Sequence, residues 1–169
     1  MVAASAPARG RVAMPIERVT LSPGASRVHD QASTFTMAVC APTQEEAWAT
    51  ARESFEWYPK YGGGLIASVA EWQEERGITG GALGTYQYTG EALKHKRDGA
   101  MGQLTIDYLR DSGSAVMGDP DACIAAAKRY EAVGCDLLLC LVNPYKIPHE
   151  KVMQTIELMG KHVLPEFKD

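Results

Sequence analysis

Long apolar runs are missing from the sequence. No stretch approaches the roughly 20 consecutive apolar residues that a membrane-spanning helix needs. The first nine residues, Met1 to Arg9, also lack the apolar core of a secretory signal. We therefore expect no membrane partner and a cytoplasmic location.

An excess of positive charge is missing too. The 169 residues carry a formal net charge of −4, with a pI near 5.6. Cations are dense only from Lys94 to Arg97, and a solvated loop explains this cluster better than a phosphate-binding surface does. Nucleic acid is therefore not an expected partner.

Cysteine is scarce, with four residues at positions 40, 123, 135 and 140, all in apolar segments. This distribution favours reduced, buried thiols over a disulfide framework. Cys135 and Cys140 are five residues apart around a predicted strand, which places their side chains on opposite faces. No metal site is predicted.

The motifs of several enzyme classes are also absent. The sequence has no Gly-x-Ser-x-Gly nucleophile elbow, and Gly80 to Gly84 matches neither the dinucleotide fingerprint nor the nucleotide-triphosphate loop. The histidines at 29, 95, 149 and 162 have no neighbours that mark a nucleophile or a metal pair. No self-contained acid–base site is predicted, and no catalytic residue is assigned.

What the sequence contains is an ordinary globular composition, 46% hydrophobic and 22% charged, in a chain long enough for one core. Residues 1–32 are rich in Ala, Pro, Arg and Ser and are expected to be a loosely structured lead-in. Residues 33–169 are expected to form the domain. Its first strand is predicted from Thr34 to Ala41, where apolar and β-branched residues alternate.

A helix is predicted directly after that strand. Thr43 and Glu46 have the spacing of a capping box, in which each side chain binds a backbone amide of the other residue. Pro59 and the glycines at 62–64 are expected to interrupt the helix. A second, short helix is expected from Leu65 to Glu75.

The pattern of the second half of the chain predicts regular βα units. A short strand at 115–117 is followed by a Gly-Asp-Pro turn at 118–120, which suits the start of a helix that ends near Gly134. The apolar run from Leu137 to Val142 is typical of a parallel strand covered on both faces. Another helix is expected from Pro148. Between the halves lies a long excursion, 77–113, with one predicted helix at 103–110.

Since βα units bind ligands at the carboxyl ends of their strands, the informative loops are 40–43, 117–120 and 142–149. The last of these is the richest in polar and aromatic side chains, which are Asn143, Tyr145, Lys146 and His149. These groups suit an anionic or planar ligand. The alternative is that His149, near a helix start, is simply solvated.

Four stretches of the chain carry a family resemblance. They are the strand from Thr34 to Ala41 with the helix start Thr43-Gln44-Glu45-Glu46-Ala47, the helix end Glu56-Trp57-Tyr58-Pro59-Lys60-Tyr61, the turn Gly118-Asp119-Pro120-Asp121-Ala122-Cys123-Ile124, and the tail from Pro148 to Phe167. In this order and spacing they resemble the C-terminal half of the luciferase-like flavin-dependent monooxygenases, the family that includes the bacterial luciferase subunits.

The resemblance implies an α/β fold, namely a partial (β/α)₈ TIM barrel with roughly the last three strands and their helices. A full barrel needs about 250 residues, so the chain is expected to be a truncated member. The implied cofactor is reduced FMN or a deazaflavin, and the implied reaction oxidises a small organic substrate with O₂. The earlier strands supply most flavin and catalytic contacts in the family, so no catalytic or cofactor-binding residue is carried over.

By the same resemblance, the excursion at 77–113 takes the place of the family's mobile active-site loop, which excludes water from the reaction. The candidate substrate-contacting residues are therefore Tyr86, Tyr88 and Lys94, together with Asn143, Tyr145 and His149. Ordinary surface residues are the competing interpretation.

A non-catalytic partial barrel is the second hypothesis. The open edges of a parallel sheet expose backbone donors and acceptors. Such a chain is expected to act as a subunit or interaction module in a homo- or hetero-oligomer.

Overall fold

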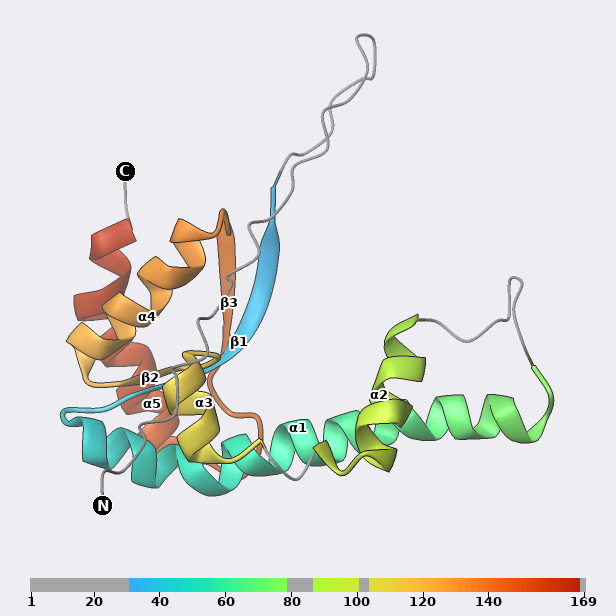
Figure 1. Ribbon diagram of the computed structural model, residues 1–169. Helices are drawn as coiled ribbons and strands as arrows, with labels where there is room; N and C mark the ends of the chain where they lie inside the picture. Colours follow the sequence, from blue (N-terminus) through green and yellow to red (C-terminus); the bar gives the residue numbers. More distant parts are fainter. Residues whose placement is uncertain (1–30, 79–86, 101–103, 168–169) are drawn as a thin grey trace, which may run out of the picture.

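The computed structural model describes residues 31–78, 87–100 and 104–167 (Figure 1). The elements in chain order are β1 (Ser33–Cys40), α1 (Gln44–Glu75), α2 (Gln87–Arg97), α3 (Ile106–Ser112), β2 (Val116–Gly118), α4 (Pro120–Ala132), β3 (Leu137–Leu141) and α5 (His149–Leu158). A π-helical turn, Met159–Val163, and a 3-10 turn, Leu164–Phe167, continue from α5. Residues 1–30 of the expected lead-in lie outside the described residues.

The three described strands form one parallel sheet in the order β2-β1-β3. Thr34, in the first half of β1, lies opposite Leu138 of β3, whereas Val39, in the second half, lies opposite Met117 of β2. Among these strands, only β1 therefore has a neighbour on each side. All three strands predicted from the sequence are confirmed, each to within one residue at either end.

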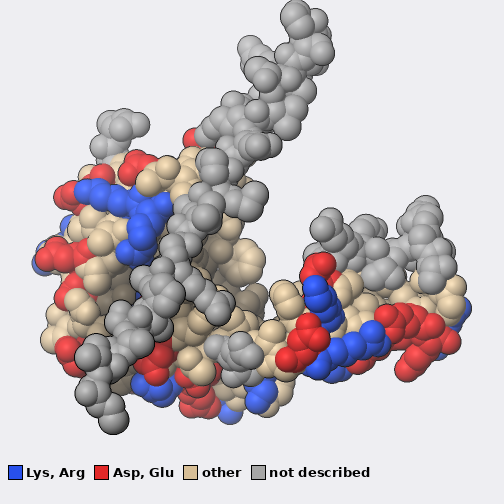
Figure 2. Space-filling model, viewed as in Figure 1, with Lys and Arg blue, Asp and Glu red and all other residues tan. Residues whose placement is uncertain are grey.

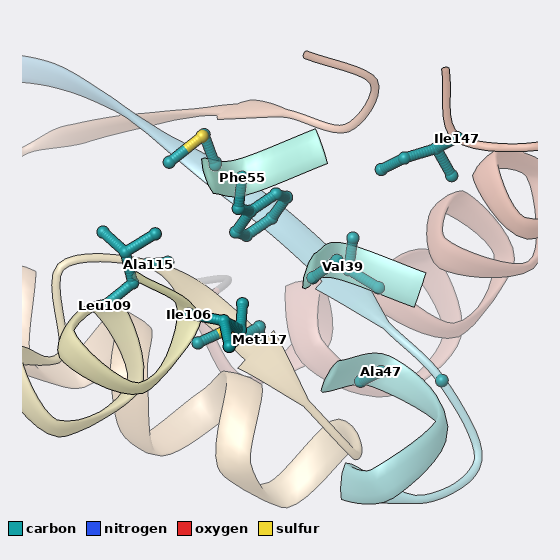
Figure 3. Packing of buried hydrophobic residues seen from close by; sticks show 11 residues of the cluster. Val39, Ala47, Phe55, Ile106, Leu109, Ala115, Met117 and Ile147 are labelled. Atoms are coloured by element: carbon teal, nitrogen blue, oxygen red, sulfur yellow. The ribbon is translucent and has the colours of Figure 1, made fainter. Parts of the chain in front are cut away.

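One face of the sheet is covered by α1 and α3. Val39 is buried there in a cluster that includes Phe55 of α1 and Leu109 of α3 (Figure 3). Because side chains alternate along a strand, the odd-numbered residues of β1 point to this face. Thr43 caps the start of α1, since its hydroxyl accepts a hydrogen bond from the Glu46 amide at 3.2 Å.

The other face is covered by α4, α5 and the π-helical turn. Cys40 is buried there in a cluster with Cys123 of α4 and Val163 of the π-helical turn. The buried Thr155 hydroxyl of α5 accepts from the Cys40 amide and donates to the Cys40 carbonyl, each at 3.2 Å. Helices therefore lie on both sides of the sheet, in three layers.

This arrangement differs from the barrel segment expected from the sequence. In a barrel, successive strands are neighbours and the helices form a single outer ring. Here the strand order is 2-1-3 and both faces carry helices, as in doubly wound α/β folds. The α/β class and the parallel sheet are confirmed, but the described residues show no barrel.

The turn predicted at 118–120 is confirmed. Asp119 Oδ1 accepts from the Ala122 amide at 2.9 Å, and Pro120 is the first residue of α4. Gly118 has φ of 143°, and a Cβ built on it would lie 2.6 Å from the Cβ of Ala122. A glycine is therefore required at this position, both for its backbone conformation and for its lack of a side chain.

The prediction that Pro59 and the glycines would interrupt the first helix is wrong. Helix α1 continues through Pro59 and 62–64 as one element of 32 residues. Its distal half is supported by α2, since Leu93 packs on Ala67 and Ala70. Tertiary packing therefore offsets the local cost of the proline and the glycines.

Two ion pairs reinforce that contact between α1 and α2. Lys96 Nζ lies 2.8 Å from a carboxylate oxygen of Glu71, and Arg97 Nη2 lies 2.6 Å from one of Glu74. Helix α2 was not predicted, because its sequence is strongly polar and contains a glycine at position 90. The helix expected at 103–110 is found as α3, shifted toward the C-terminus.

The prediction that the third strand is covered on both faces is wrong. Leu137 and Leu139 are 47% and 55% exposed, so one face of β3 is largely uncovered in the described residues. They lie directly opposite Ser33 and Phe35 of β1, and Phe35 is itself 58% exposed. An apolar patch of Phe35, Leu137 and Leu139 is therefore left on this face, which we call the sheet patch.

Replacing Gly64 by alanine tests the continuity of α1. A Cβ at Gly64 meets nothing within 4 Å. In a continuous helix, Gly64→Ala should raise the free energy of unfolding by about 1 kcal/mol, since glycine is that much less favourable than alanine in a helix. Urea denaturation followed by circular dichroism measures this change.

The control for that experiment is Gly77→Ala. Gly77 follows α1 and has φ of 62°, so alanine there should destabilise the protein even though the space is open. Loss of stability in Gly64→Ala would show that α1 is interrupted at its glycines.

Candidate functional site

A cavity of about 470 Å³ lies at the carboxyl ends of β1 and β3. Its walls come from the first part of α1, from the loop between β3 and α5, and from the start of α5. The lining side chains are Glu46, Ala49, Thr50, Glu53, Ser54, Tyr145, Lys146, Ile147, Pro148 and Lys151. The loop between β3 and α5 is one of the three loops at which the sequence analysis expected a ligand to bind.

The layering of the fold explains why a cavity opens here. After β1 the chain turns to α1 on one face of the sheet, and after β3 it turns to α5, whose Thr155 and following π-helical turn pack on the other face. Neighbouring strands whose following helices diverge to opposite faces leave a crevice outside their carboxyl ends, which is where doubly wound folds bind ligands.

Two hydrogen bonds hold the β3–α5 loop in place. The buried Ser54 hydroxyl of α1 accepts from the Tyr145 amide at 2.9 Å. Asn143 Oδ1 accepts from the Ile147 amide at 3.1 Å. Between them, Lys146 has φ of 48°, in the left-handed region. The loop is thus tied to α1 while its side chains at 145 and 146 face the cavity.

An aromatic stack extends from this loop along α1. The rings of Tyr145 and Trp57 are 4.1 Å apart at an angle of 4°, and Trp57 also stacks on Tyr61 at 4.8 Å. The Lys146 ammonium lies 4.9 Å from the centre of the Tyr145 ring. A side-chain hydrogen bond with Tyr145, together with the charge of Glu53, raises the pKa of Lys146 above its ordinary value. Lys146 is therefore a cation at neutral pH.

A second cation is held by an ion pair across the cavity. Lys151 of α5 binds a carboxylate oxygen of Glu46, and its ammonium also lies 3.4 Å from Gln154 Oε1. Both partners of the ion pair are about one-third exposed. Glu46 had been expected to bind the backbone at the helix start, and the structure shows that its carboxylate joins α1 to α5 instead.

The structure brings together some of the candidate residues and separates others. Tyr145 lines the cavity, Asn143 supports its loop, and His149 is exposed at the start of α5. Lys94 is exposed on α2, the helix that packs on the distal half of α1 (Figure 1). Tyr88 also belongs to α2. Tyr86 lies outside the described residues.

Several lining residues were not recognised as site residues from the sequence. Lys151 and Ser54 lie within helices at positions that look solvated or merely amphipathic. Ser54 meets Tyr145 through a hydrogen bond that spans 91 residues of sequence, and Lys151 meets Glu46 across 105 residues. One sequence signal did point to this part of α1: Trp57, which stacks on Tyr145, belongs to a stretch that carries the family resemblance.

The cysteines do not contribute to this cavity. All four are free thiols; Cys40 and Cys123 are buried as expected, while Cys135 and Cys140 are partly exposed. The hydrogen bond with Cys40, together with burial, raises the pKa of the Cys123 thiol above its ordinary value. Among residues 31–78, 87–100 and 104–167, no three His, Cys, Asp or Glu side chains are grouped so that they could hold a metal ion. None of the described helices combines the length and apolarity of a membrane span.

Comparisons with known proteins find only a distant similarity. No protein-family model matches it, and no curated protein matches it. Among solved structures, the monooxygenase RslO1 from Streptomyces bottropensis is similar, with a TM-score of 0.42 and 16% sequence identity over 80% of this chain and 31% of that chain. This chain thus spans about a third of the length of that monooxygenase, and we draw no functional argument from a similarity at this level.

Replacing Ser54 by alanine tests the anchor of the cavity loop. Ser54→Ala leaves the partly buried Tyr145 amide without its acceptor, which should cost about 1–3 kcal/mol of unfolding free energy. The matched control is Ser68→Ala on the same helix, where the exposed hydroxyl binds only the Leu65 carbonyl. Equal effects of the two substitutions on the urea midpoint would contradict the anchoring role of Ser54.

Proposed function

We propose that the chain forms part of a luciferase-like flavin-dependent monooxygenase, and that the cavity beside Tyr145 receives a planar, anionic ligand of the reduced FMN or deazaflavin class. The observation that carries the proposal is the combination of a stacked aromatic ring with two lysines at the carboxyl ends of β1 and β3. The sequence resemblance supplies the monooxygenase reaction and the flavin.

The chemistry of the lining residues fits such a ligand. A planar ring can stack on an aromatic side chain, and a phosphate is stabilised by ammonium groups. Tyr145 offers the aromatic ring and Lys146 offers an ammonium on a flexible stem. Lys151, oriented by Glu46, offers a second ammonium from the opposite wall. The cavity volume of about 470 Å³ is in the range of small-molecule sites.

Each group has a limited role in this proposal. When bound, reduced flavin supplies the electrons with which O₂ is activated. Tyr145, held in place by its stack on Trp57, binds and orients the planar ring, while Lys146 and Lys151 hold the anionic end. The described residues that line the cavity exclude water only in part, because the cavity is open on one side. We propose that further strands complete the enclosure and, with it, the oxidation of a small organic substrate.

Flavin titration of the full chain tests the proposal. Oxidised and reduced FMN should each bind with a dissociation constant below about 1 mM, and Tyr145→Ala should weaken binding about 10-fold or more, equivalent to the stacking energy of one ring. Isothermal titration calorimetry under anaerobic conditions measures both forms.

The control variant is Tyr108→Ala, which removes a tyrosine that is 52% exposed on α3. It should bind FMN as the unaltered chain does. No binding to the unaltered chain, or equal loss in both variants, would reject the cavity as the flavin site.

A second candidate function is that of a non-catalytic subunit. It is favoured by the sheet patch, where Phe35 lies directly opposite Leu139 and both are more than half exposed. Exposed apolar patches together with an open strand edge favour pairing with another chain. In this proposal a partner strand or sheet covers the patch, in a homo- or hetero-oligomer.

Introducing a charge into the sheet patch tests this second candidate. If another copy covers the patch, Leu139→Lys should shift the chain toward monomer in sedimentation velocity, because a charge would have to be buried without a partner. The control is Leu164→Lys, at a leucine that is 53% exposed outside the patch. An unchanged distribution in Leu139→Lys would exclude self-association through this face.

A further inference from the structure

The distal half of α1, from Tyr61 to Glu75, extends away from the sheet with α2 beside it (Figure 1). We call residues 61–75 the arm. One side of the arm is covered: Ala67 and Ala70 pack on Leu93 of α2, and Glu71 and Glu74 pair with cations of α2. Figure 2 shows basic and acidic side chains side by side over α1 and α2.

The opposite side of the arm carries an apolar stripe. Its four members are Tyr61, Leu65, Val69 and Trp72, which are 52%, 73%, 45% and 49% exposed. They are separated by four, four and three residues, so they fall within about 80° of one another around the helix. This is the spacing with which one helix packs along another.

We propose that a second copy of this chain covers the stripe, with the two arms antiparallel about a two-fold axis. The stripe has aromatic residues at its ends, Tyr61 and Trp72, and aliphatic residues, Leu65 and Val69, in its middle. An antiparallel pairing therefore places Tyr61 of each copy opposite Trp72 of the other and joins the aliphatic residues at the centre. A two-fold interface requires this self-complementarity, since the same patch is used on both copies.

The charges beside the stripe agree with the same alignment. Lys60 lies next to one aromatic end, with its ammonium 5.5 Å from the centre of the Tyr61 ring. Glu75 and Arg76 follow the other end, where the Arg76 guanidinium lies 4.5 Å from the Trp72 ring. The pairing that aligns Tyr61 with Trp72 brings Lys60 of one copy near Glu75 of the other. Glu75, which pairs with Arg76 of its own copy at 3.8 Å, then lies between two cations at each end of the interface.

The size of the stripe is sufficient for such a contact. Four large side chains that are each about half exposed present roughly 400 Å² of apolar surface per copy, which is at the scale of patches that mark interaction sites. With the flanking residues, two copies would bury about 1,000 Å² in total, the lower end of specific interfaces. The proposal uses neither the cavity nor the sheet patch, so it does not rest on the proposed function.

Sedimentation velocity of the full chain from about 1 to 100 µM tests the proposal, because a contact of this size is expected to associate in the micromolar range. The unaltered chain should show a concentration-dependent dimer, and Leu65→Glu should weaken dimerisation at least 10-fold. Met153→Glu is the control, since Met153 is 49% exposed on α5. A chain that stays monomeric at 100 µM, or a dimer unaffected by Leu65→Glu, would overturn the proposal.

A charge exchange tests the antiparallel alignment and the identity of the partner. Lys60→Glu alone should weaken the dimer, because it places two carboxylates together at each end. Adding Glu75→Lys to Lys60→Glu should restore dimerisation. If the double variant is no better than the single one, the two arms do not pair in this register and the proposal fails.

Discussion

The pairing of β1 with a strand on each side is the interaction on which the rest of the structure depends. The first half of β1 hydrogen-bonds to β3 and the second half to β2. Neither of those strands pairs with the other in the described sheet. Every backbone donor and acceptor of a buried strand needs a partner, and β1 is the strand that joins β2 and β3 into one sheet. The residues from Thr36 to Cys40 are accordingly all buried.

Burial of β1 on both faces determines where the helices go. Val39 is covered by α1 and α3, and Cys40 is covered by α4 and by the segment that includes Thr155. The chain leaves β1 toward one of these faces and β3 toward the other. That divergence separates the start of α1 from the start of α5, and the cavity with Tyr145, Lys146 and Lys151 occupies the space between them. The candidate site is a consequence of the layering rather than of any single motif.

The same layering leaves three surfaces incompletely covered. In the part of the chain that the structure describes, the cavity is open, no helix covers the sheet patch, and α2 lies on only one side of the arm of α1. Each surface has different chemistry: two lysines, two glutamates and an aromatic ring in the cavity, Phe35 and two leucines on the sheet, and a helical apolar stripe on the arm. The proposed occupants differ accordingly: a flavin in the cavity, a partner strand on the sheet patch and a second arm on the stripe. Variants at Tyr145, Leu139 and Leu65 test these three occupants separately.

Elements that are determined by residues close together in the sequence were predictable. The strand containing Val39 follows from the alternation of side chains, and the start of α4 follows from Asp119 and Pro120, whose cap and first-turn roles are local. The continuation of α1 through Pro59 was not predictable, because it depends on Leu93, more than 30 residues further along the chain. Local propensity favours an interruption there, and packing by α2 overrides it.

For the candidate site, the sequence by itself determined that Asn143, Tyr145, Lys146 and His149 follow a strand, at the end where βα units bind ligands. Only the tertiary structure decided which of them meet. Tyr145 and Lys146 join Lys151 and Glu46 around a cavity, whereas His149 remains at the surface and Lys94 lies on α2. The physical reason is the order of the strands. With β1 between β2 and β3, pairing between strands far apart in the sequence brings α1 close to the β3–α5 loop. Periodicity and capping signals reflect only residues close together in the sequence, so they do not encode this contact.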